Sequence, residues 1–293
     1  MTAPDPGRLD AHALRRAAER AAATHDAHAV LHARINEEML ARLDLLAFEP
    51  AVIVDLGCRT GEAARALKRR WRKARVIALD AAPAMLAEAR TRQSWFGRFE
   101  RVCADALRLP FAAGSVDLVY SNLWLPWAVD LDATLAEVRR VVKLRGYFTF
   151  ATLGPDTLKE LRAAWAAVDE SVHVHRFLDM HDIGDALLRA GFADPVMDVD
   201  RHTLTYANPP ALLGELRGLG AQNALVERRR GLTGRARFAA MEAQYARRAD
   251  ADGRICATCE VIYGQAWCPG VAPPVRGRRG ESVVPIESLR RRP

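Results

Sequence analysis

Between residues 51 and 153, short apolar runs alternate with longer segments whose apolar positions recur at helical spacing. Because the apolar runs have few polar interruptions, we expect a mostly parallel sheet that helices cover on both faces, an α/β fold. The strands are predicted at 51–56, 75–80, 99–104, 116–121 and 146–153, and the helices at 61–72, 83–92 and 131–142.

The same spacing of apolar positions predicts helices and strands on both sides of this region. Helical spacing marks 10–46, and further helices are predicted at 156–168 and 181–190. Strands are predicted from Val196 to Tyr206 and from Ile255 to Trp267, and we expect this pair to be antiparallel. The expected divisions are a helical N-terminal unit at 1–50, a core at 51–208, an arginine-rich helical cap insertion at 209–250, a last core strand at 251–267 and a flexible basic tail at 268–293.

The stretch from Val52 to Gly61 is the most informative part of the pattern. An acid ends the strand, and a turn with glycines at Gly57 and Gly61 leads into the next helix, where the backbone can approach an anionic ligand. Asp80 ends the second strand, nineteen residues beyond Gly61, and a carboxylate there can accept hydrogen bonds from both hydroxyls of a ribose. The unit predicts binding of an adenosine-containing cofactor, whereas the alternative is a glycine-containing turn without a ligand.

The spacing of the turn distinguishes between cofactors. A dinucleotide fingerprint would need glycine at 59 and 62, where the chain has Arg59 and Glu62. The pattern from Asp55 to Gly61, D-x-G-x-x-x-G, resembles motif I of the class I S-adenosylmethionine methyltransferases, which is usually D-x-G-x-G-x-G. The resemblance implies that Asp55 faces the amino group of the methionine moiety.

Arg59 replaces the middle glycine of that motif. An arginine fits this bend if its φ is negative and its side chain turns away, or if its guanidinium folds over the ligand carboxylate. The third alternative is that Arg59 blocks the pocket. We expect tolerance, because the other motif residues and Asp105 remain.

Further candidates follow the third and fourth strands. Asp105 can accept a hydrogen bond from the adenine amine, and we place Ala106 and Asn122 at the cofactor as well. The loop after Asn122 carries two tryptophans, of which we assign Trp127 to the substrate; the alternative is that they close the core.

With these pieces placed, nearly all of the chain resembles the malonyl-[acyl-carrier protein] O-methyltransferases of biotin synthesis. The likeness rests on RAAATHDAHAVLH (20–32), VDLGCRTG (54–61), CADALRLPFAAGSVDLVYSNLWLPW (103–127), ATLGPDTLKELRAAWAAVDE (151–170), HRFLDMHDIGDALLRAGFADPVMD (175–198) and ATCEVIYGQAW (257–267). It implies a Rossmann-like class I methyltransferase fold with seven mostly parallel strands, the last one antiparallel, and an N-terminal lid. It also implies S-adenosylmethionine as cofactor and a malonyl thioester as acceptor, in an early step of biotin synthesis.

The chain also departs from this family. Ala18 and His25 stand where Phe and Tyr are common, and His32 where Gln is usual. The segment 143–146 lacks the usual Pro-Gly turn. A mitochondrial respiratory-chain assembly factor described as a hydroxylase is similar over the same stretch, so a non-methylating or degenerate relative is the alternative function.

Methyl transfer to a carboxylate requires no general base, because the acceptor is already ionised at neutral pH. We therefore expect no catalytic acid–base residue, and alignment and water exclusion to supply the rate enhancement. A guanidinium suits the acceptor carboxylate, and Arg176 is the candidate. The alternatives for Arg176 are a structural ion pair and a surface charge.

The formal net charge of +7 suits an acidic partner. The cap insertion concentrates arginines, which favours an acidic acyl carrier protein, with malonyl-coenzyme A as the alternative acceptor and a solvated helix face as the alternative for the cap. We place RNA lower, because the cap does not interleave aromatic residues with its arginines in the way that single-strand binders do. The cap arginines are Arg217, Arg228, Arg229, Arg230, Arg235, Arg237, Arg247 and Arg248.

The rest of the sequence argues against a membrane-spanning segment, a metal site and a disulfide framework. No apolar run approaches spanning length, and five cysteines spread over 293 residues predict a reducing cytoplasm. His25, His28 and His32 share one helical side but have no accompanying carboxylate or cysteine, so we favour a solvated or lid face over a metal site. The C-x-x-C of Cys256 and Cys259 lies in a predicted strand, where residues three apart point to opposite faces.

Overall fold

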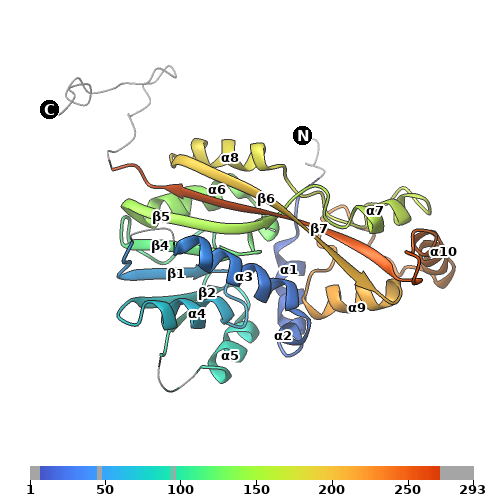
Figure 1. Cartoon of the computed structure of the whole chain (residues 1–293), viewed down its shortest axis with the longest axis horizontal. Helices are drawn as coiled ribbons and strands as arrows, with labels where there is room; N and C mark the ends of the chain where they lie inside the picture. The colour runs from blue at the N-terminus through green and yellow to red at the C-terminus, as the bar shows by residue number, and fades with distance from the viewer. Residues whose placement is uncertain (1–6, 45–47, 94, 96, 271–293) are drawn as a thin grey trace, which may run out of the picture.

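The computed structural model describes residues 7–44, 48–93, 95 and 97–270, so most of the expected basic tail lies outside the described residues. Within them, seven strands form one sheet in the order β3-β2-β1-β4-β5-β7-β6. β7 alone among these strands runs against its neighbours, β5 and β6 (Figure 1). The predicted fold, with its antiparallel last strand, is confirmed. The strands are β1 (Val52–Leu56), β2 (Arg75–Asp80), β3 (Glu100–Cys103), β4 (Val116–Asn122), β5 (Val142–Leu153), β6 (Ala193–Tyr206) and β7 (Ile255–Trp267).

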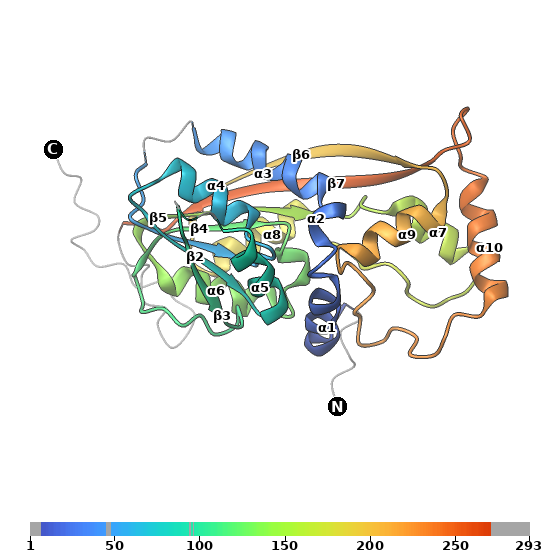
Figure 2. The same ribbon diagram turned by 90° about the horizontal axis from the view of Figure 1, so that it is seen from below.

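Helices cover both faces of the sheet (Figure 2). α3, α4 and α5 pack on one face and α6 and α8 on the other. The helices are α1 (Ala11–Ala21), α2 (His25–His28), α3 (Val30–Leu43), α4 (Glu62–Arg70), α5 (Pro83–Thr91), α6 (Leu131–Val141), α7 (Lys159–Ala166), α8 (Met180–Arg189), α9 (Pro209–Gly218) and α10 (Arg235–Ala246), with the short 3-10 helix η1 at Leu125–Trp127.

The double cover explains why the strands are apolar almost throughout. Ile53 and Val76 contribute to the core beneath α3, α4 and α5, and their neighbours Val54 and Ile77 to the core beneath α6 and α8. Since successive side chains of a strand point to opposite faces, both faces need apolar residues.

β6 and β7 extend beyond the rest of the sheet as a long antiparallel ribbon. They contain 14 and 13 residues and pair from Ala193–Trp267 to Tyr206–Ile255. The far end of this ribbon carries α7, α9 and α10, which enclose a separate apolar core around Trp165, Met241 and Tyr245 (Figure 1). The segment between the two strands therefore forms a helical cap beside the open end of the sheet.

The segment 10–46, predicted to be helical, contains three helices within the described residues, α1, α2 and α3. The chain bends after α1, where the Thr24 hydroxyl donates to the carbonyls of Ala21 and Gly218 and so ties the bend to α9. A second break at Ala29 separates α2 from α3. Contacts with the cap, which local periodicity does not encode, override the helical pattern here.

The fifth strand begins earlier than predicted. β5 starts at Val142, directly after α6, where the sequence pattern indicated a start at 146. Arg145 adopts a φ of +62°, and its N–H donates to the carbonyl of Cys268. Pairing with the residue that follows β7 thus extends the strand through a polar segment.

Candidate active site

The first cavity lies at the carboxyl ends of β1, β2 and β4 and has a volume of about 360 Å³. This is the edge at which open α/β sheets bind ligands. The loops after these strands and after β3 form its floor, and α1 lines its opposite wall. Its lining includes Ala11, His12, Leu14, Arg15, Ala18, Gly57, Arg59, Asp80, Met85, Asp105, Ala106, Trp124 and Trp127.

The turn after β1 is shaped by a tryptophan. Gly57 has a φ of +73°, and a Cβ at this position would lie 2.0 Å from Cγ of Trp124. The N–H groups of Gly57 and Cys58 both donate to the carbonyl of Leu79, which holds the turn against the end of β2. A side chain at 57 would therefore displace the indole, independently of its backbone cost.

Asp80 presents a fixed carboxylate to this cavity. Its Oδ2 accepts a hydrogen bond of 3.0 Å from the N–H of Arg59, and its Oδ1 one of 2.8 Å from the N–H of Ala82. Burial raises the pKa of Asp80, although these backbone donors and the Arg59 charge oppose the shift. Each oxygen keeps a second lone pair for a ligand hydroxyl.

Of the eight residues predicted to hold the cofactor, five line this cavity. Asp105 is exposed and its Oδ1 accepts from the N–H of Leu107 at 2.9 Å, whereas Ala106 is buried. The five are Gly57, Arg59, Asp80, Asp105 and Ala106.

The other three, Asp55, Gly61 and Asn122, lie outside the lining. Asp55 is buried and accepts a hydrogen bond from the N–H of Ala64 at the start of α4, and burial raises its pKa to about 7. Gly61 packs instead against Phe99. Asn122 donates from Nδ2 to the carbonyl of His32 at 3.0 Å and so holds the start of α3. Their direct contact with a cofactor stays a prediction.

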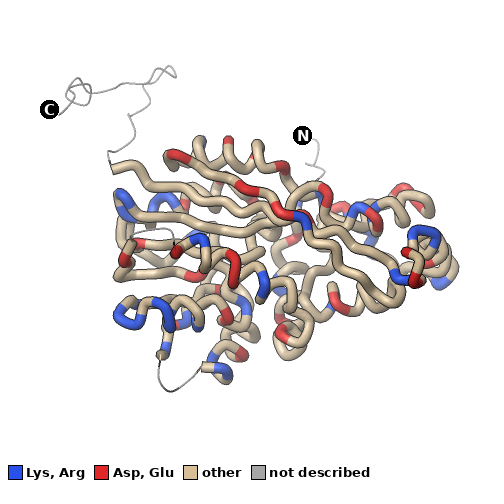
Figure 3. Tube along the Cα trace, viewed as in Figure 1, with Lys and Arg blue, Asp and Glu red and all other residues tan. Residues whose placement is uncertain are grey.

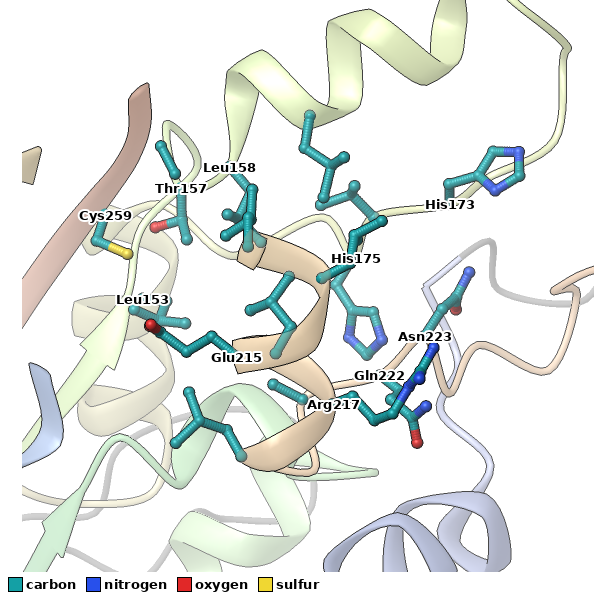
Figure 4. A pocket seen from close by; sticks show the side chains of 18 of the residues that line it. Leu153, Thr157, Leu158, His173, His175, Glu215, Arg217, Gln222, Asn223 and Cys259 are labelled. Carbon is teal, nitrogen blue, oxygen red and sulfur yellow. The ribbon is translucent and has the colours of Figure 1, made fainter. Parts of the chain in front are cut away.

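A second, larger cavity of about 570 Å³ lies between the sheet and the cap. Most of its wall is apolar and comes from α7, α9 and the segment 172–177. Figure 4 shows Glu215 and Arg217 leaving α9 in opposite directions, Glu215 toward Cys259 and Arg217 toward Gln222 and Asn223. The cavity can therefore enclose an apolar or amide-containing chain, with polar groups near its rim.

Among the described residues, Arg59 and Trp127 alone line both cavities. The ring of Trp127 packs edge-on against His175, with 5.1 Å between the ring centroids. Nη1 of Arg59 donates to the carbonyl of Leu219 at 3.5 Å, and Nη2 to that of Leu123 at 3.3 Å. The two cavities therefore adjoin at these two side chains, a place that we call the opening between them.

The backbone of Arg59 contradicts the negative φ expected for a side chain that turns away. Its φ is +50°, in the left-handed region that glycine favours. Leu123 and Leu158 also have positive φ values, of +52° and +55°, and both line the second cavity. Strained backbone of this kind persists where the surrounding structure enforces it, as it often does at functional sites.

His25 and His32 face the protein interior, which excludes the solvated face for these two histidines and leaves the lid face, the other alternative. His25 is buried and burial lowers its pKa to about 3, with the Arg59 charge as the next contribution. The His32 pKa is lowered for the same two reasons, and this residue lines the second cavity, as a lid residue would. The centroids of the His25 and His32 rings lie 5.5 Å apart.

Arg176 is exposed and lines neither of these cavities. It borders a third one, beside Phe177 and Leu178. Its expected contact with the acceptor carboxylate therefore stays a prediction that the position of the side chain does not support.

Among the described residues, one group of three side chains could hold a metal ion, formed by Glu38, Asp200 and His202. Both carboxylate oxygens of Glu38 already accept hydrogen bonds, one from Arg34 at 2.6 Å and the other from the Tyr263 hydroxyl. Cys256 and Cys259 are free thiols, and Cys259 alone of the two borders the second cavity. None of the helices in the described ranges combines the length and the apolar character needed to cross a membrane.

Sequence reasoning missed much of the lining. Trp124 lies directly against Gly57, yet only its place in a loop after β4 marked it. α9 and the segment 219–223 come from far along the chain, and no motif links them to β1. In the sequence, only Asn208 and the two prolines after it indicated that a separate helical unit begins there, since they form the start of α9.

Comparison with known proteins agrees with this arrangement. Residues 54–150 match the family model described as a methyltransferase domain. The malonyl-[acyl-carrier protein] O-methyltransferase of Laribacter hongkongensis is 47% identical, over 92% of this chain and 94% of its own length. That of Halorhodospira halophila is 45% identical, over 100% and 99%. The fold is also similar to that of the YcgJ protein of Bacillus subtilis, with a TM-score of 0.58 at 15% identity, over 80% of this chain and 98% of that one.

Proposed function

The chain belongs to the family of malonyl-[acyl-carrier protein] O-methyltransferases, and from this we propose that it transfers a methyl group from S-adenosylmethionine to the free carboxylate of a malonyl thioester. One observation carries the proposal beyond the family likeness. A cavity at the cofactor edge of the sheet and a larger apolar cavity meet at Arg59 and Trp127, so that a donor and an acceptor can meet there.

The first cavity fits the donor. Asp80 offers buried carboxylate oxygens for the ribose, and the absence of a side chain at Gly57 leaves room for the Trp124 indole beside the turn. Asp105 and Ala106 lie where the adenine is expected. When bound, S-adenosylmethionine supplies the methyl group from a sulfonium centre. Ala18 of α1 also borders this cavity, which supports the proposal of an N-terminal lid.

The second cavity fits the acceptor chemistry. A malonyl carboxylate is ionised at neutral pH and needs no proton removed before it attacks. The apolar wall, with Leu123 and Trp127 at the opening, excludes water from the reacting oxygen. Orientation and water exclusion of this kind can contribute about 7–11 kcal/mol to a rate enhancement. Thus these residues act by positioning, without an acid–base catalyst.

For the carrier of the malonyl group, we propose an acyl carrier protein in preference to coenzyme A. Arginines surround the cap side of the second cavity, and seven of the eight cap arginines are exposed. Figure 3 shows basic residues on α10 at one end of the molecule. A basic rim increases the association rate of an acidic protein. Arg228 is the exception, because it is half-buried and donates to Asp10 and to the carbonyl of Leu225.

The deciding experiment is isotope transfer from methyl-labelled S-adenosylmethionine to malonyl-acyl carrier protein, with acetyl-acyl carrier protein as the control acceptor. Label in the malonyl product that is released by mild base identifies a methyl ester. Binding of S-adenosylmethionine without any transfer would instead identify a non-methylating relative, the alternative function. We place the protein in the cytoplasm as a further proposal, supported by five cysteines that are all free thiols.

A further inference from the structure

Arg59 extends from one cavity to the other. Its backbone N–H donates to Asp80, which lines the cofactor cavity. Its guanidinium donates to the carbonyls of Leu123 and Leu219, and both of these residues line the second cavity and not the first. The charged end of the side chain thus lies on the acceptor side of the opening.

The guanidinium has unused capacity for an anion. Arg59 is half-buried and forms no ion pair within 4.0 Å among the described residues. Its Nε is buried and has no hydrogen-bond partner there, and the two bonds that it does make are long, at 3.3 and 3.5 Å. A half-buried cation with a buried, unpartnered N–H favours a bound carboxylate, which a guanidinium can hold through two parallel hydrogen bonds.

His32 supplies a second unsatisfied polar group at the same opening. It lines the second cavity, and its Nδ1 is buried without a hydrogen-bond partner among the described residues. Asn122 fixes the backbone carbonyl of His32. Burial, and after it the Arg59 charge, lowers the pKa of His32, so this ring remains neutral and can donate one N–H at neutral pH.

We propose that Arg59, assisted by His32, holds the free carboxylate of the acceptor at the opening between the two cavities and thereby selects a dicarboxylic acyl thioester over a neutral one. The inference rests on the proposed function. The three other arginines that line the second cavity, Arg217, Arg228 and Arg229, lie on its cap side and do not reach the cofactor cavity. Arg59 is therefore the cation placed where the reacting oxygen must be.

The test compares ligands with and without the carboxylate. Malonyl- and acetyl-acyl carrier protein are titrated calorimetrically against the full-length parent, Arg59→Gly and Arg59→Lys, in the presence of S-adenosylhomocysteine. Glycine is the residue that a φ of +50° favours, so the first variant relieves backbone strain and should fold. Lysine keeps the charge but loses the forked geometry.

We expect Arg59→Gly to weaken malonyl binding by about 10- to 100-fold, the effect of losing a charge-assisted hydrogen bond, and to leave acetyl binding within twofold. Arg59→Lys should give an intermediate loss. The affinity for S-adenosylmethionine should stay within about tenfold of the parent in both variants. Arg98→Gln, an exposed arginine beside Trp95, is the matched control and should change neither acceptor.

Equal losses for malonyl and acetyl ligands would overturn the inference, as would unchanged malonyl binding in Arg59→Gly. A loss confined to S-adenosylmethionine would also overturn it and would assign the guanidinium to the cofactor. If the parent binds malonyl-acyl carrier protein but transfers no methyl group, the proposed function fails while the carboxylate site stands. The two failures are therefore distinguishable.

Discussion

At the scale of single residues, Asp80 is the carboxylate that both the turn and the ligand need. Asp80→Asn keeps the shape and one acceptor oxygen but removes the charge that strengthens hydrogen bonds to a ribose. We expect affinity for S-adenosylmethionine, measured by calorimetry, to fall by roughly 1.5–3 kcal/mol. Asp182→Asn is the matched control, because Asp182 is exposed on α8 and lines neither cavity, so it should change affinity much less. Equal effects of the two substitutions would contradict this assignment.

Gly57 is constrained both by its left-handed backbone and by the side chain of Trp124 beside it, whereas Gly114 has the backbone constraint alone. Gly57→Ala places a methyl group against Trp124 in a left-handed backbone, whereas Gly114→Ala, at a φ of +58°, meets nothing within 4 Å. The control should lose about 1–2 kcal/mol of stability from backbone strain alone. Gly57→Ala should lose more and should also alter Trp fluorescence and weaken S-adenosylmethionine binding. Similar melting temperatures with intact binding would show that the indole moves aside freely.

Asp55 makes stability depend on pH. Burial raises the pKa of Asp55 in the folded protein to about 7, above its ordinary value of 3.8, so the folded state retains a proton that the unfolded state releases. The resulting stabilisation is fully present below about pH 4, declines by about 1.4 kcal/mol per pH unit and is lost above about pH 7, a total of about 4 kcal/mol.

Asp55→Asn should remove that decline. Urea unfolding of the parent and the variant between pH 5 and 8 measures the difference, which should move in favour of the variant as the pH rises. Parallel stability curves would mean that Asp55 is already ionised in the folded protein.

At the scale of elements, the cap supplies the docking charge. Three exposed arginines of the cap line neither of the two cavities: Arg230, Arg235 and Arg237. Changing all three to Glu therefore tests the effect of surface charge without altering the lining of either cavity. We expect a higher KM for malonyl-acyl carrier protein and a weaker dependence of that KM on salt, with malonyl-coenzyme A less affected.

An equal charge change elsewhere provides the control. Arg69, Arg72 and Lys73 are exposed at the end of α4, next to the start of β2 and thus at the opposite edge of the sheet from the site. Their change to Glu should leave the KM for the carrier protein nearly unchanged. If both triple variants raise KM alike, net charge matters and the location of the arginines does not.

Elements also show where the sequence was sufficient. β7 spans Ile255–Trp267 as predicted, because a long and mostly apolar run of this kind forms a strand that is buried along almost its whole length. The helical segment predicted over 10–46 contains breaks that its periodicity does not mark. At the first break the Thr24 hydroxyl donates to the carbonyl of Gly218, nearly two hundred residues away. Local patterns carry no information about such contacts.

At the scale of the whole molecule, the sequence identifies the cofactor side of the site better than the acceptor side. Gly57 and Asp80 belong to one β-loop-α-β unit whose spacing indicates a ligand. The second cavity instead joins α7 and α9 to the loop after β4, and only folding brings these segments together. Arg176 was chosen from a motif-like segment, whereas Arg59 reaches the opening because α9 places the carbonyl of Leu219 beside it.

Thermal stability and substrate specificity make opposite demands on the second cavity. Its wall contains three residues with left-handed backbone: Arg59, Leu123 and Leu158. Each of them costs conformational energy that glycine would avoid, of about 1–2 kcal/mol. Directed evolution for heat resistance alone should therefore accumulate glycine at Arg59, where the backbone gain is not offset by lost apolar packing. The hardier proteins obtained in this way would discriminate poorly between acyl groups, so selection for endurance needs a counter-selection for substrate choice.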